Sequence, residues 1–281
     1  MSQPPKILVF DSGLGGLTVL AEVMRLRPDG RFLYAADDAG FPYGPLSEDA
    51  LIARVNRVMD KLIALFSPDL VVIACNTAST LVLPHLRARY PAIPFVGTVP
   101  AVKPAAALSR SQMISILATP GTVTRDYTHD LVRNYAAHCD VTLAGSDQLA
   151  ALAEAFMKSE AVGDAAIAAE IAPCFVTNGD RRTDCIVLAC THYPLLIDAF
   201  KRLAPWPVEW IDPAPAIARR VDYVLSERLG LPCDFEPSST PSPVHAALFT
   251  STHPPGAALT AALKDRGLAK ILLDPIPLET V

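Results

Sequence analysis

Residues 68–77 read PDLVVIACNT, and residues 183–192 read TDCIVLACTH. In both segments an aspartate precedes a short apolar run, and the run closes with Ala-Cys followed by polar residues. A continuous apolar run of this length is typical of a strand buried on both faces of a parallel sheet. Because the two cysteines fall in the same register, 115 residues apart, we predict that the chain contains an internal repeat.

Predicted strands and helices alternate on either side of these segments. Strands are expected at residues 7–10, 32–35, 70–74, 113–117 and 186–189 and near Val141, and helices at 17–27 and 47–66. This alternation is typical of parallel sheets covered by helices on both faces, so the fold class is α/β. We expect two similar parallel-sheet α/β domains related by pseudo-twofold symmetry, with the active site between them where the carboxyl ends of the strands meet.

A break in the alternation sets the expected domain boundary. Residues 97–104, GTVPAVKP, interrupt the pattern and predict a crossover between domains. A stretch rich in Pro and Ser at 232–243 predicts an extended connector. Beyond it, residues 246–250, 257–264 and 270–273 are typical of a strand, a helix and a strand that return to the first domain. The expected domains are residues 1–98 with 212–281, and residues 99–211.

The composition favours a small-molecule ligand. The chain has 281 residues, 51% of them hydrophobic and 19% charged, with a formal net charge of −5 at pH 7. This charge attracts neither a nucleic acid nor an anionic membrane surface, so we expect neither as a partner. The four apolar residues at 7–10 are too few for the core of a signal peptide, and runs of five or six residues elsewhere are too short for a membrane span. We expect a cytoplasmic protein whose six cysteines are free thiols.

Cys75 and Cys190 are the strongest candidates for catalytic groups. Each follows a predicted buried strand and precedes polar residues that can cap a helix, which after Cys75 is expected at residues 80–87. The positive end of a helix favours the thiolate, which is the reactive form of cysteine. His192 stands two residues after Cys190 and could hold the thiol proton or donate to a substrate. A lone buried cysteine is usually a core residue, but two in matching registers favour a catalytic pair.

Two other uses of these thiols are compatible with the residues. Cys75, Cys190 and His192 could bind a metal, although the sequence lacks the two close cysteine pairs of a typical zinc site. A single cysteine could instead be the nucleophile of a Cys-His hydrolase, which leaves the second cysteine unexplained. The paired register therefore favours catalysis by two thiols.

Two loops add candidates for ligand binding. Residues 11–16, DSGLGG, follow the first predicted strand, and their glycines permit a close approach of backbone to ligand. The stretch lacks the lysine of a phosphate-binding P-loop. Asp11 could act on a ligand or cap a helix, and Tyr43 in the predicted turn 42–44 could project its hydroxyl or pack.

Six motifs stand in the order of a known family. They are DSGLGG at 11–16, PYG at 42–44, CNTAS at 75–79, VPAVKPA at 99–105, ATPGTV at 118–123 and CTHYPLL at 190–196. With these motifs the chain resembles the glutamate racemases of the Asp/Glu racemase family. The resemblance implies a homodimeric isomerase that interconverts L- and D-glutamate without a cofactor or a metal. It also implies that the D-glutamate is used for bacterial peptidoglycan and cell-wall biogenesis.

The resemblance assigns roles to individual residues. It implies that Cys75 removes the α-proton of D-glutamate and that Cys190 removes that of L-glutamate, from opposite faces of the carbon. Asp11 would assist Cys75, and His192 and Glu154 would assist Cys190. The residues implied in substrate binding are Asp11, Ser12, Pro42, Tyr43, Gly44, Cys75, Asn76, Thr77, Thr119, Thr122, Cys190, Thr191 and His192.

Some positions depart from the family pattern. The usual Thr-Ala-Arg before Pro-Tyr-Gly is Asp38-Ala39-Gly40, the lysine often found after Gly44 is Pro45, and the glycine before the second cysteine is Ala189. We expect these changes to affect loop packing or domain closure more than the type of reaction. Two alternatives are a racemase of aspartate or another acidic amino acid, and a non-catalytic binding protein that keeps the pocket and acts on a partner such as DNA gyrase.

Overall fold

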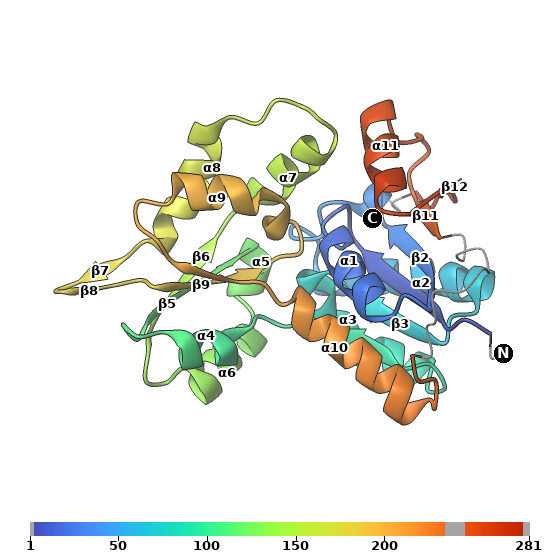
Figure 1. Cartoon of the computed structure of the whole chain (residues 1–281), viewed down its shortest axis with the longest axis horizontal. Helices are drawn as coiled ribbons and strands as arrows, with labels where there is room; N and C mark the ends of the chain where they lie inside the picture. The colour runs from blue at the N-terminus through green and yellow to red at the C-terminus, as the bar shows by residue number, and fades with distance from the viewer. Residues whose placement is uncertain (1–2, 234–244, 278–281) are drawn as a thin grey trace. The chain divides into compact units, whose positions relative to one another are not determined.

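Two separate parallel sheets organise the chain (Figure 1), in a computed structural model that describes residues 3–233 and 245–277. The chain divides into one unit of Met1–Thr98 with Ala214–Val281 and a second unit of Val99–Pro213. The boundaries expected from the sequence, 98/99 and 211/212, coincide with the first junction and precede the second by two residues. Residues 234–243 of the predicted connector lie outside the described residues.

The first unit is built on a six-stranded sheet in the order β12-β11-β2-β1-β3-β4, in which neighbouring strands run parallel. The strands are β1 (Lys6–Asp11), β2 (Arg31–Ala36), β3 (Leu70–Ile73), β4 (Phe95–Gly97), β11 (Ala246–Phe249) and β12 (Lys270–Leu273). Strand β11 pairs with β2, so the C-terminal strands extend the sheet that the N-terminal segment begins.

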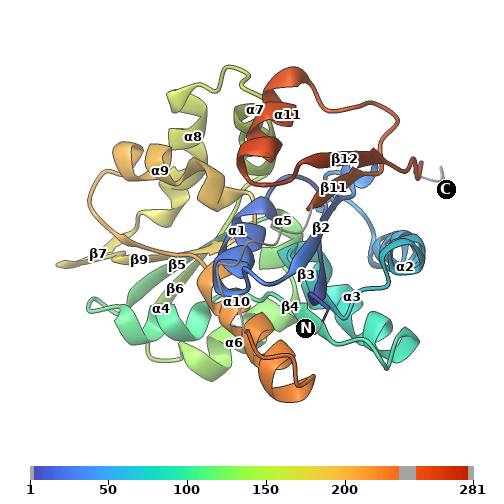
Figure 2. The same cartoon turned by 45° about the vertical axis from the view of Figure 1, so that its right-hand side comes forward.

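Helices cover both faces of this sheet (Figure 2). Helices α1 (Leu17–Leu26) and α10 (Ala214–Tyr223) pack together on one face, whereas α2 (Glu48–Phe66) and α3 (Asn76–Arg89) lie on the other. The unit also contains the helical turns η1 (Asp38–Gly40) and η4 (Val224–Arg228) and helix α11 (Ala257–Asp265).

The packing of α2 follows from its sequence. Strands β1 to β3 contribute alternate residues, such as Leu8 and Phe10, to one buried cluster, because successive side chains of a strand point to opposite faces. Helix α2 meets this cluster with a stripe of residues spaced three or four apart, namely Leu51, Val55, Val58, Met59 and Leu62. The hydroxyl of Ser47 accepts a hydrogen bond from the Ala50 backbone N–H at 3.3 Å and so caps the helix.

The second unit has a four-stranded parallel sheet in the order β10-β9-β5-β6. The strands are β5 (Met113–Ala118), β6 (Asp140–Gly145), β9 (Cys185–Ala189) and β10 (Glu209–Ile211). Helices α4 (Val102–Leu108) and α6 (Asp126–Tyr135) lie on one face, and α7 (Leu149–Met157), α8 (Asp164–Ile171) and α9 (Ile197–Leu203) lie on the other (Figure 1). The shorter elements are α5 (Pro120–Val123), η2 (Ala172–Cys174), η3 (Tyr193–Leu196) and the antiparallel pair β7 (Thr177–Asn178) and β8 (Arg181–Arg182).

The two sheets share a strand order. The series β2-β1-β3-β4 of the first sheet corresponds to β6-β5-β9-β10 of the second. Strand β3 leads to Cys75 and strand β9 leads to Cys190, so the two cysteines follow equivalent strands. The predicted α/β class, with two similar domains built on parallel sheets, is confirmed.

One element boundary differs from the prediction at a point that matters for the site. The helix predicted from residue 80 begins at Asn76, directly after Cys75, and runs through Pro84 to Arg89. The polar residues 76–79 thus form the first turn of the helix rather than a loop before it. As a result, the backbone N–H groups of the helix start next to the thiol.

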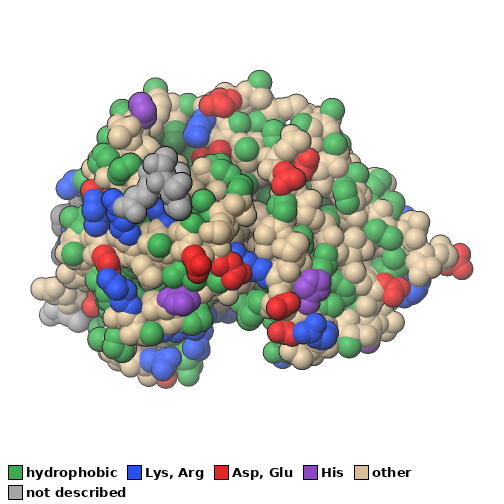
Figure 3. All heavy atoms as spheres, turned by 180° about the vertical axis from the view of Figure 1, so that it is seen from behind, with side chains coloured by type: hydrophobic (Ala, Val, Ile, Leu, Met, Phe, Trp, Pro, Cys, Tyr) green, Lys and Arg blue, Asp and Glu red, His purple; other side chains and the backbone are tan. Residues whose placement is uncertain are grey.

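The surface carries charged side chains of both signs, in keeping with the 24 Lys and Arg and 29 Asp and Glu residues of the chain. Figure 3 shows acidic and basic side chains interspersed on one face of the molecule. Within the described ranges, no helix is long and apolar enough to cross a membrane.

Candidate active site

Cys75 lies between a buried strand and a helix of the first unit. Strand β3 ends at Ile73, and Ala74 extends its pairing by donating its N–H to the carbonyl of Phe10 at 2.8 Å. Cys75 then occupies the N-cap position of α3, and its side chain is buried. The partial positive charge of a helix N-terminus favours an anionic sulfur or an anionic ligand at this point.

The loop after β1 reaches this cysteine because β1 and β3 are neighbours in the sheet. The Oγ of Ser12 lies 3.6 Å from the Sγ of Cys75. The buried carboxylate of Asp11 accepts a hydrogen bond from the Gly13 backbone N–H at 3.1 Å. A Cβ on Gly16 would lie 2.7 Å from the Cβ of Asp11, so this loop can fold against the aspartate only with glycine at position 16.

The first turn of α3 carries a buried polar network. The Ser79 hydroxyl donates to the carbonyl of Ile73 at 2.7 Å and accepts from the Thr98 backbone N–H at 3.1 Å. The Thr98 hydroxyl donates to the Oδ1 of Asn76 at 3.5 Å. The Nδ2 of Asn76 is buried and has no hydrogen-bond partner among the described residues. Since a buried N–H without a partner costs free energy, this amide is a candidate donor to a bound ligand.

The turn predicted at residues 42–44 lies at 43–46, where the Leu46 N–H donates to the carbonyl of Tyr43 at 3.1 Å, and it carries a buried tyrosine. Tyr43 belongs to the same apolar cluster as Cys75. Its hydroxyl donates to the Oδ2 of Asp37 at 2.5 Å, so the side chain packs and its hydroxyl is held by the protein. Burial and the negative charge of Asp37 raise the pKa of the Tyr43 phenol well above its ordinary value. The phenol therefore stays protonated and acts as a hydrogen-bond donor.

Cys190, His192 and Glu154 form a row of hydrogen-bonding side chains in the second unit. The Sγ of Cys190 lies 3.8 Å from the Nδ1 of His192, whose Nε2 lies 3.0 Å from the Oε1 of Glu154. All three side chains are buried. The Nζ of Lys158, the residue directly after α7, lies 3.4 Å from the other oxygen of Glu154. A thiol, an imidazole and a carboxylate in this order can move a proton to and from sulfur.

Three threonines of the second unit are also among the predicted site residues. The hydroxyls of Thr119 and Thr122 lie 3.0 Å apart at the start of α5, which follows β5. Thr191 is buried directly after the thiol of Cys190. Because β5 and β9 are neighbours in the sheet, the segments that follow them lie at the same edge. The hydroxyl of Tyr193 is buried here without a hydrogen-bond partner in the described part of the chain.

The predicted site residues divide between the two units, and we call the two sets the first group and the second group. In both groups a cysteine follows one strand, and a loop that follows the neighbouring strand carries polar residues. The first group is Asp11, Ser12, Pro42, Tyr43, Gly44, Cys75, Asn76 and Thr77, and the second is Thr119, Thr122, Glu154, Cys190, Thr191 and His192.

The remaining cysteines have different surroundings. None of the six cysteines, all of which lie in the described part of the chain, forms a disulfide. Cys174 and Cys185 are fully buried, and burial raises the pKa of each thiol to about 12. Burial also raises the pKa of Cys139, and Cys233 is exposed. Cys174 and Cys185 are therefore protonated core residues at neutral pH, as their apolar surroundings require.

A cavity in the first unit does not include the predicted site. It has a volume of about 660 Å³ and is lined by Tyr90, residues 91–97 and the side chains of Arg87, Arg220 and Arg228, among others. None of the predicted site residues lines it.

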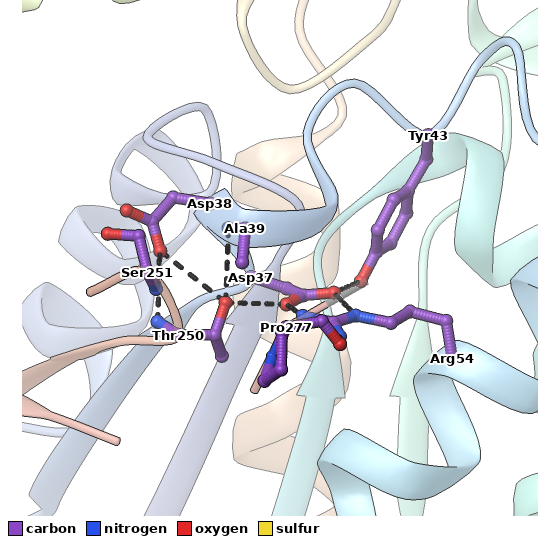
Figure 4. Close-up of polar contacts among 8 residues, drawn as sticks. All are labelled: Asp37, Asp38, Ala39, Tyr43, Arg54, Thr250, Ser251 and Pro277. Atoms are coloured by element: carbon purple, nitrogen blue, oxygen red, sulfur yellow. Dashed lines mark hydrogen bonds and ion pairs between the residues drawn. The ribbon is translucent and has the colours of Figure 1, made fainter. Parts of the chain in front are cut away.

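Sequence reasoning missed three residues around Tyr43. Asp37, which follows β2, accepts hydrogen bonds from Arg54 and Thr250 as well as from Tyr43 (Figure 4). Arg54 could have been found, because it falls three residues after Leu51 within the apolar stripe of α2, where a charged side chain needs a buried partner. Thr250 has no local signal, since it lies 213 residues from Asp37.

Comparisons with known proteins agree with the motifs. A family model described as Asp/Glu/Hydantoin racemase matches residues 19–221. A glutamate racemase of Brucella anthropi is 59% identical over 222 residues, which cover 79% of this chain and 80% of that protein. The crystal structure of Escherichia coli glutamate racemase with L-glutamate and the activator UDP-MurNAc-ala is 35% identical, with a TM-score of 0.86 over 99% of this chain and 100% of its own. A glutamate racemase from Thermus thermophilus is 27% identical, with a TM-score of 0.69 over 98% of both chains.

The fold is that of the solved glutamate racemases. The chain belongs to the Asp/Glu/hydantoin racemase family. It is an isomerase, and the resemblance inferred from the six motifs is confirmed.

Proposed function

We propose that this chain interconverts L- and D-glutamate without a cofactor, with Cys75 and Cys190 as its two bases. The shared strand order is the main support, because it gives each unit one cysteine after an equivalent strand. Each thiol also has its own polar neighbour, Ser12 at 3.6 Å and His192 at 3.8 Å. A hydrolase with a single nucleophile would leave one of these two arrangements without a use.

Inversion at a carbon requires proton transfer on two opposite faces. One cysteine, as thiolate, removes the α-proton, and the electron pair of the broken C–H bond is delocalised towards the α-carboxylate. The other cysteine, as thiol, gives its proton to the opposite face and becomes the thiolate. The enzyme thus ends one turnover ready for the reverse direction. From the family resemblance we infer that Cys75 acts on D-glutamate and Cys190 on L-glutamate.

Neighbouring groups assist each thiol. Beside Cys190, the imidazole of His192 holds the thiol proton, and Glu154 orients the ring through its 3.0 Å contact with Nε2. Beside Cys75, the carboxylate of Asp11 fixes the loop that carries Ser12 through its hydrogen bond to the Gly13 N–H.

The substrate is held by neutral donors. The two carboxylates of glutamate suit the hydroxyls of the site threonines and of Ser12, the Asn76 amide and backbone N–H groups at helix starts. The buried Nδ2 of Asn76, which has no partner in the described ranges, supports this assignment. Donors aimed at the charge that develops in the transition state raise the rate more than donors that bind the ground state equally well.

Glutamate is the proposed substrate because the relatives reported above are named glutamate racemases, and the E. coli enzyme was solved with L-glutamate. By the same resemblance we infer that the D-glutamate serves peptidoglycan synthesis in the cytoplasm and that the enzyme is a homodimer.

The test is to incubate purified, chelator-treated protein with L-glutamate or L-aspartate and follow circular dichroism. We expect loss of signal with glutamate only. Cys75→Ser and Cys190→Ser should each slow the reaction by about 10²-fold or more, whereas Cys233→Ser, at an exposed thiol, should match the wild type. Wild-type turnover in either active-site variant would refute the two-thiol mechanism, and equal rates with aspartate would refute the assigned substrate.

A further inference from the structure

The carboxylate of Asp37 is the centre of a buried hydrogen-bonding cluster in the first unit (Figure 4). Its Oδ2 accepts from the Tyr43 hydroxyl at 2.5 Å and from the Nε of Arg54 at 2.9 Å. Its Oδ1 accepts from the Nη2 of Arg54 at 2.5 Å and from the Thr250 hydroxyl at 2.6 Å. Both oxygens are therefore satisfied, and the guanidinium binds them in the two-pronged geometry that fixes direction as well as distance.

This cluster joins the turn that begins at Tyr43 to the C-terminal part of the unit. Thr250 directly follows strand β11, and its backbone N–H and that of Ser251 both donate to the Oδ1 of Asp38 at 2.9 Å. The Nη1 of Arg54 donates to the carbonyl of Pro277 at 2.9 Å. Residues far apart in the sequence thus hold the segment that leads to Tyr43.

Gly40 explains why the cluster can form. A Cβ at this position would lie 2.7 Å from the Oδ2 of Asp37, 3.0 Å from the Cε1 of Tyr43 and 3.3 Å from the Nε of Arg54. The three side chains therefore occupy the space that any larger residue at position 40 would need. The glycine that departs from the family pattern is required here for packing.

Tyr43 also belongs to the apolar cluster that contains Cys75. The negative charge of a Cys75 thiolate adds to burial and to Asp37 in raising the pKa of the Tyr43 phenol, so the two side chains are close enough to interact. The hydroxyl donates to Asp37, which leaves the ring and the backbone of Tyr43 to pack in this cluster.

We propose that Asp37, Arg54 and Thr250 are positioning residues that hold the Tyr43 turn against Cys75, and that they make the geometry of this thiol depend on the C-terminal strand β11. In this role none of the three touches the substrate. The effect on turnover rests on the proposed racemase function, but the effect on Cys75 itself does not.

The test measures how fast iodoacetamide alkylates each thiol of the full chain, by peptide mass spectrometry. Two hydroxyls donate to Asp37. Tyr43→Phe removes one of them and leaves the Asp37–Arg54 ion pair in place, and Thr250→Val removes the other. We expect each variant to raise the alkylation rate of Cys75 at least threefold and to leave the rate of Cys190 unchanged. The matched controls Tyr223→Phe and Thr252→Val, at exposed positions, should behave as the wild type.

Kinetics with L- and D-glutamate give the second readout. A loosened turn should raise KM more than it lowers kcat, because the turn belongs to the proposed binding group. If both variants keep the wild-type alkylation rate of Cys75, the positioning role is wrong, whether or not the protein racemises glutamate. If the rate of Cys75 rises while no variant or wild-type protein racemises glutamate, the positioning role stands and the proposed function fails.

Gly40→Ala adds a methyl group where the cluster leaves no space for one, and so tests the role of Gly40 in packing. The added methyl group should displace the cluster and raise the alkylation rate of Cys75 as Tyr43→Phe does. Gly163→Ala is the control, since a Cβ there meets nothing within 4 Å. An unchanged Cys75 rate in Gly40→Ala would contradict the proposal.

Discussion

The Nε2 of His192 lies 3.0 Å from the Oε1 of Glu154, on a helix 38 residues earlier in the chain. A carboxylate accepts hydrogen bonds, so this contact places the ring proton of a neutral His192 on Nε2. Nδ1 is then the acceptor nitrogen, and it is the atom that lies 3.8 Å from the Sγ of Cys190. The contact with Glu154 thus prepares the imidazole to take a proton from the thiol.

Glu154→Gln tests this arrangement. The glutamine amide can donate to Nε2 and so favour the opposite tautomer, with the proton on Nδ1. We expect kcat from L-glutamate to fall by about 10²-fold with a smaller change in KM. Glu160→Gln, at an exposed position three residues after the end of α7, is the matched control. Initial rates by circular dichroism measure both, and a Glu154→Gln enzyme with wild-type kcat would rule out the proton-positioning role.

Asn76→Asp tests whether the amide beside Cys75 binds a substrate carboxylate. The change keeps the size of the side chain but replaces an N–H donor with a negative charge, which repels a carboxylate. We expect KM for glutamate to rise at least about tenfold, the loss of roughly 1.4 kcal/mol of binding. The control is Asn178→Asp on the exposed strand β7. An unchanged KM would show that Asn76 does not contact the substrate.

Gly16→Ala tests the fit of the loop that carries Asp11. The new Cβ would lie 2.7 Å from the Cβ of Asp11 and 3.1 Å from that of Ala74, so the loop has to move. Overpacking of this kind lowers the free energy of unfolding by about 1–3 kcal/mol. Urea denaturation should show this loss for Gly16→Ala and none for Gly163→Ala. Equal midpoints would mean that the loop has more room than the structure shows.

The sequence predicts the site because its signals are local. Cys75 and Cys190 each end an apolar run, and parallel strands bring such ends to one edge of a sheet. Glu154 was assigned by resemblance alone, and its contact with His192 depends on how α7 packs on the second sheet. The cluster around Asp37 is less accessible to prediction, because Thr250 and Pro277 reach it through the pairing of β11 with β2. Pairing between strands so distant in sequence leaves no local pattern.

The raised pKa of the Cys174 thiol predicts that the free energy of unfolding depends on pH. Its pKa in the folded protein is about 12, against about 8.5 for an exposed thiol in the unfolded chain. The raised pKa means that the unfolded state loses its proton first. Below about pH 8.5 this difference in pKa leaves the free energy of unfolding unchanged. Above that pH it lowers the free energy of unfolding by up to about 1.4 kcal/mol per pH unit.

Urea denaturation between pH 7.5 and 10.5 measures this slope. Cys174→Ala should lose less stability per pH unit than the wild type, even if it is less stable at pH 7.5. Cys233→Ala, which removes an exposed thiol, should keep the wild-type slope. Parallel curves for the wild type and Cys174→Ala would show that Cys174 does not remain protonated in the fold.

In the proposed mechanism two different sulfur atoms exchange protons with one carbon, and the isotope content of each enantiomer tests this. L-glutamate is incubated in heavy water, and both enantiomers are separated and analysed by mass spectrometry during the first few per cent of reaction. We expect D-glutamate that carries deuterium on Cα and recovered L-glutamate that carries none, because the removed proton stays on one cysteine while the other cysteine delivers solvent deuterium. Product that retains the original proton, or recovered substrate that gains deuterium as fast as product forms, would contradict it.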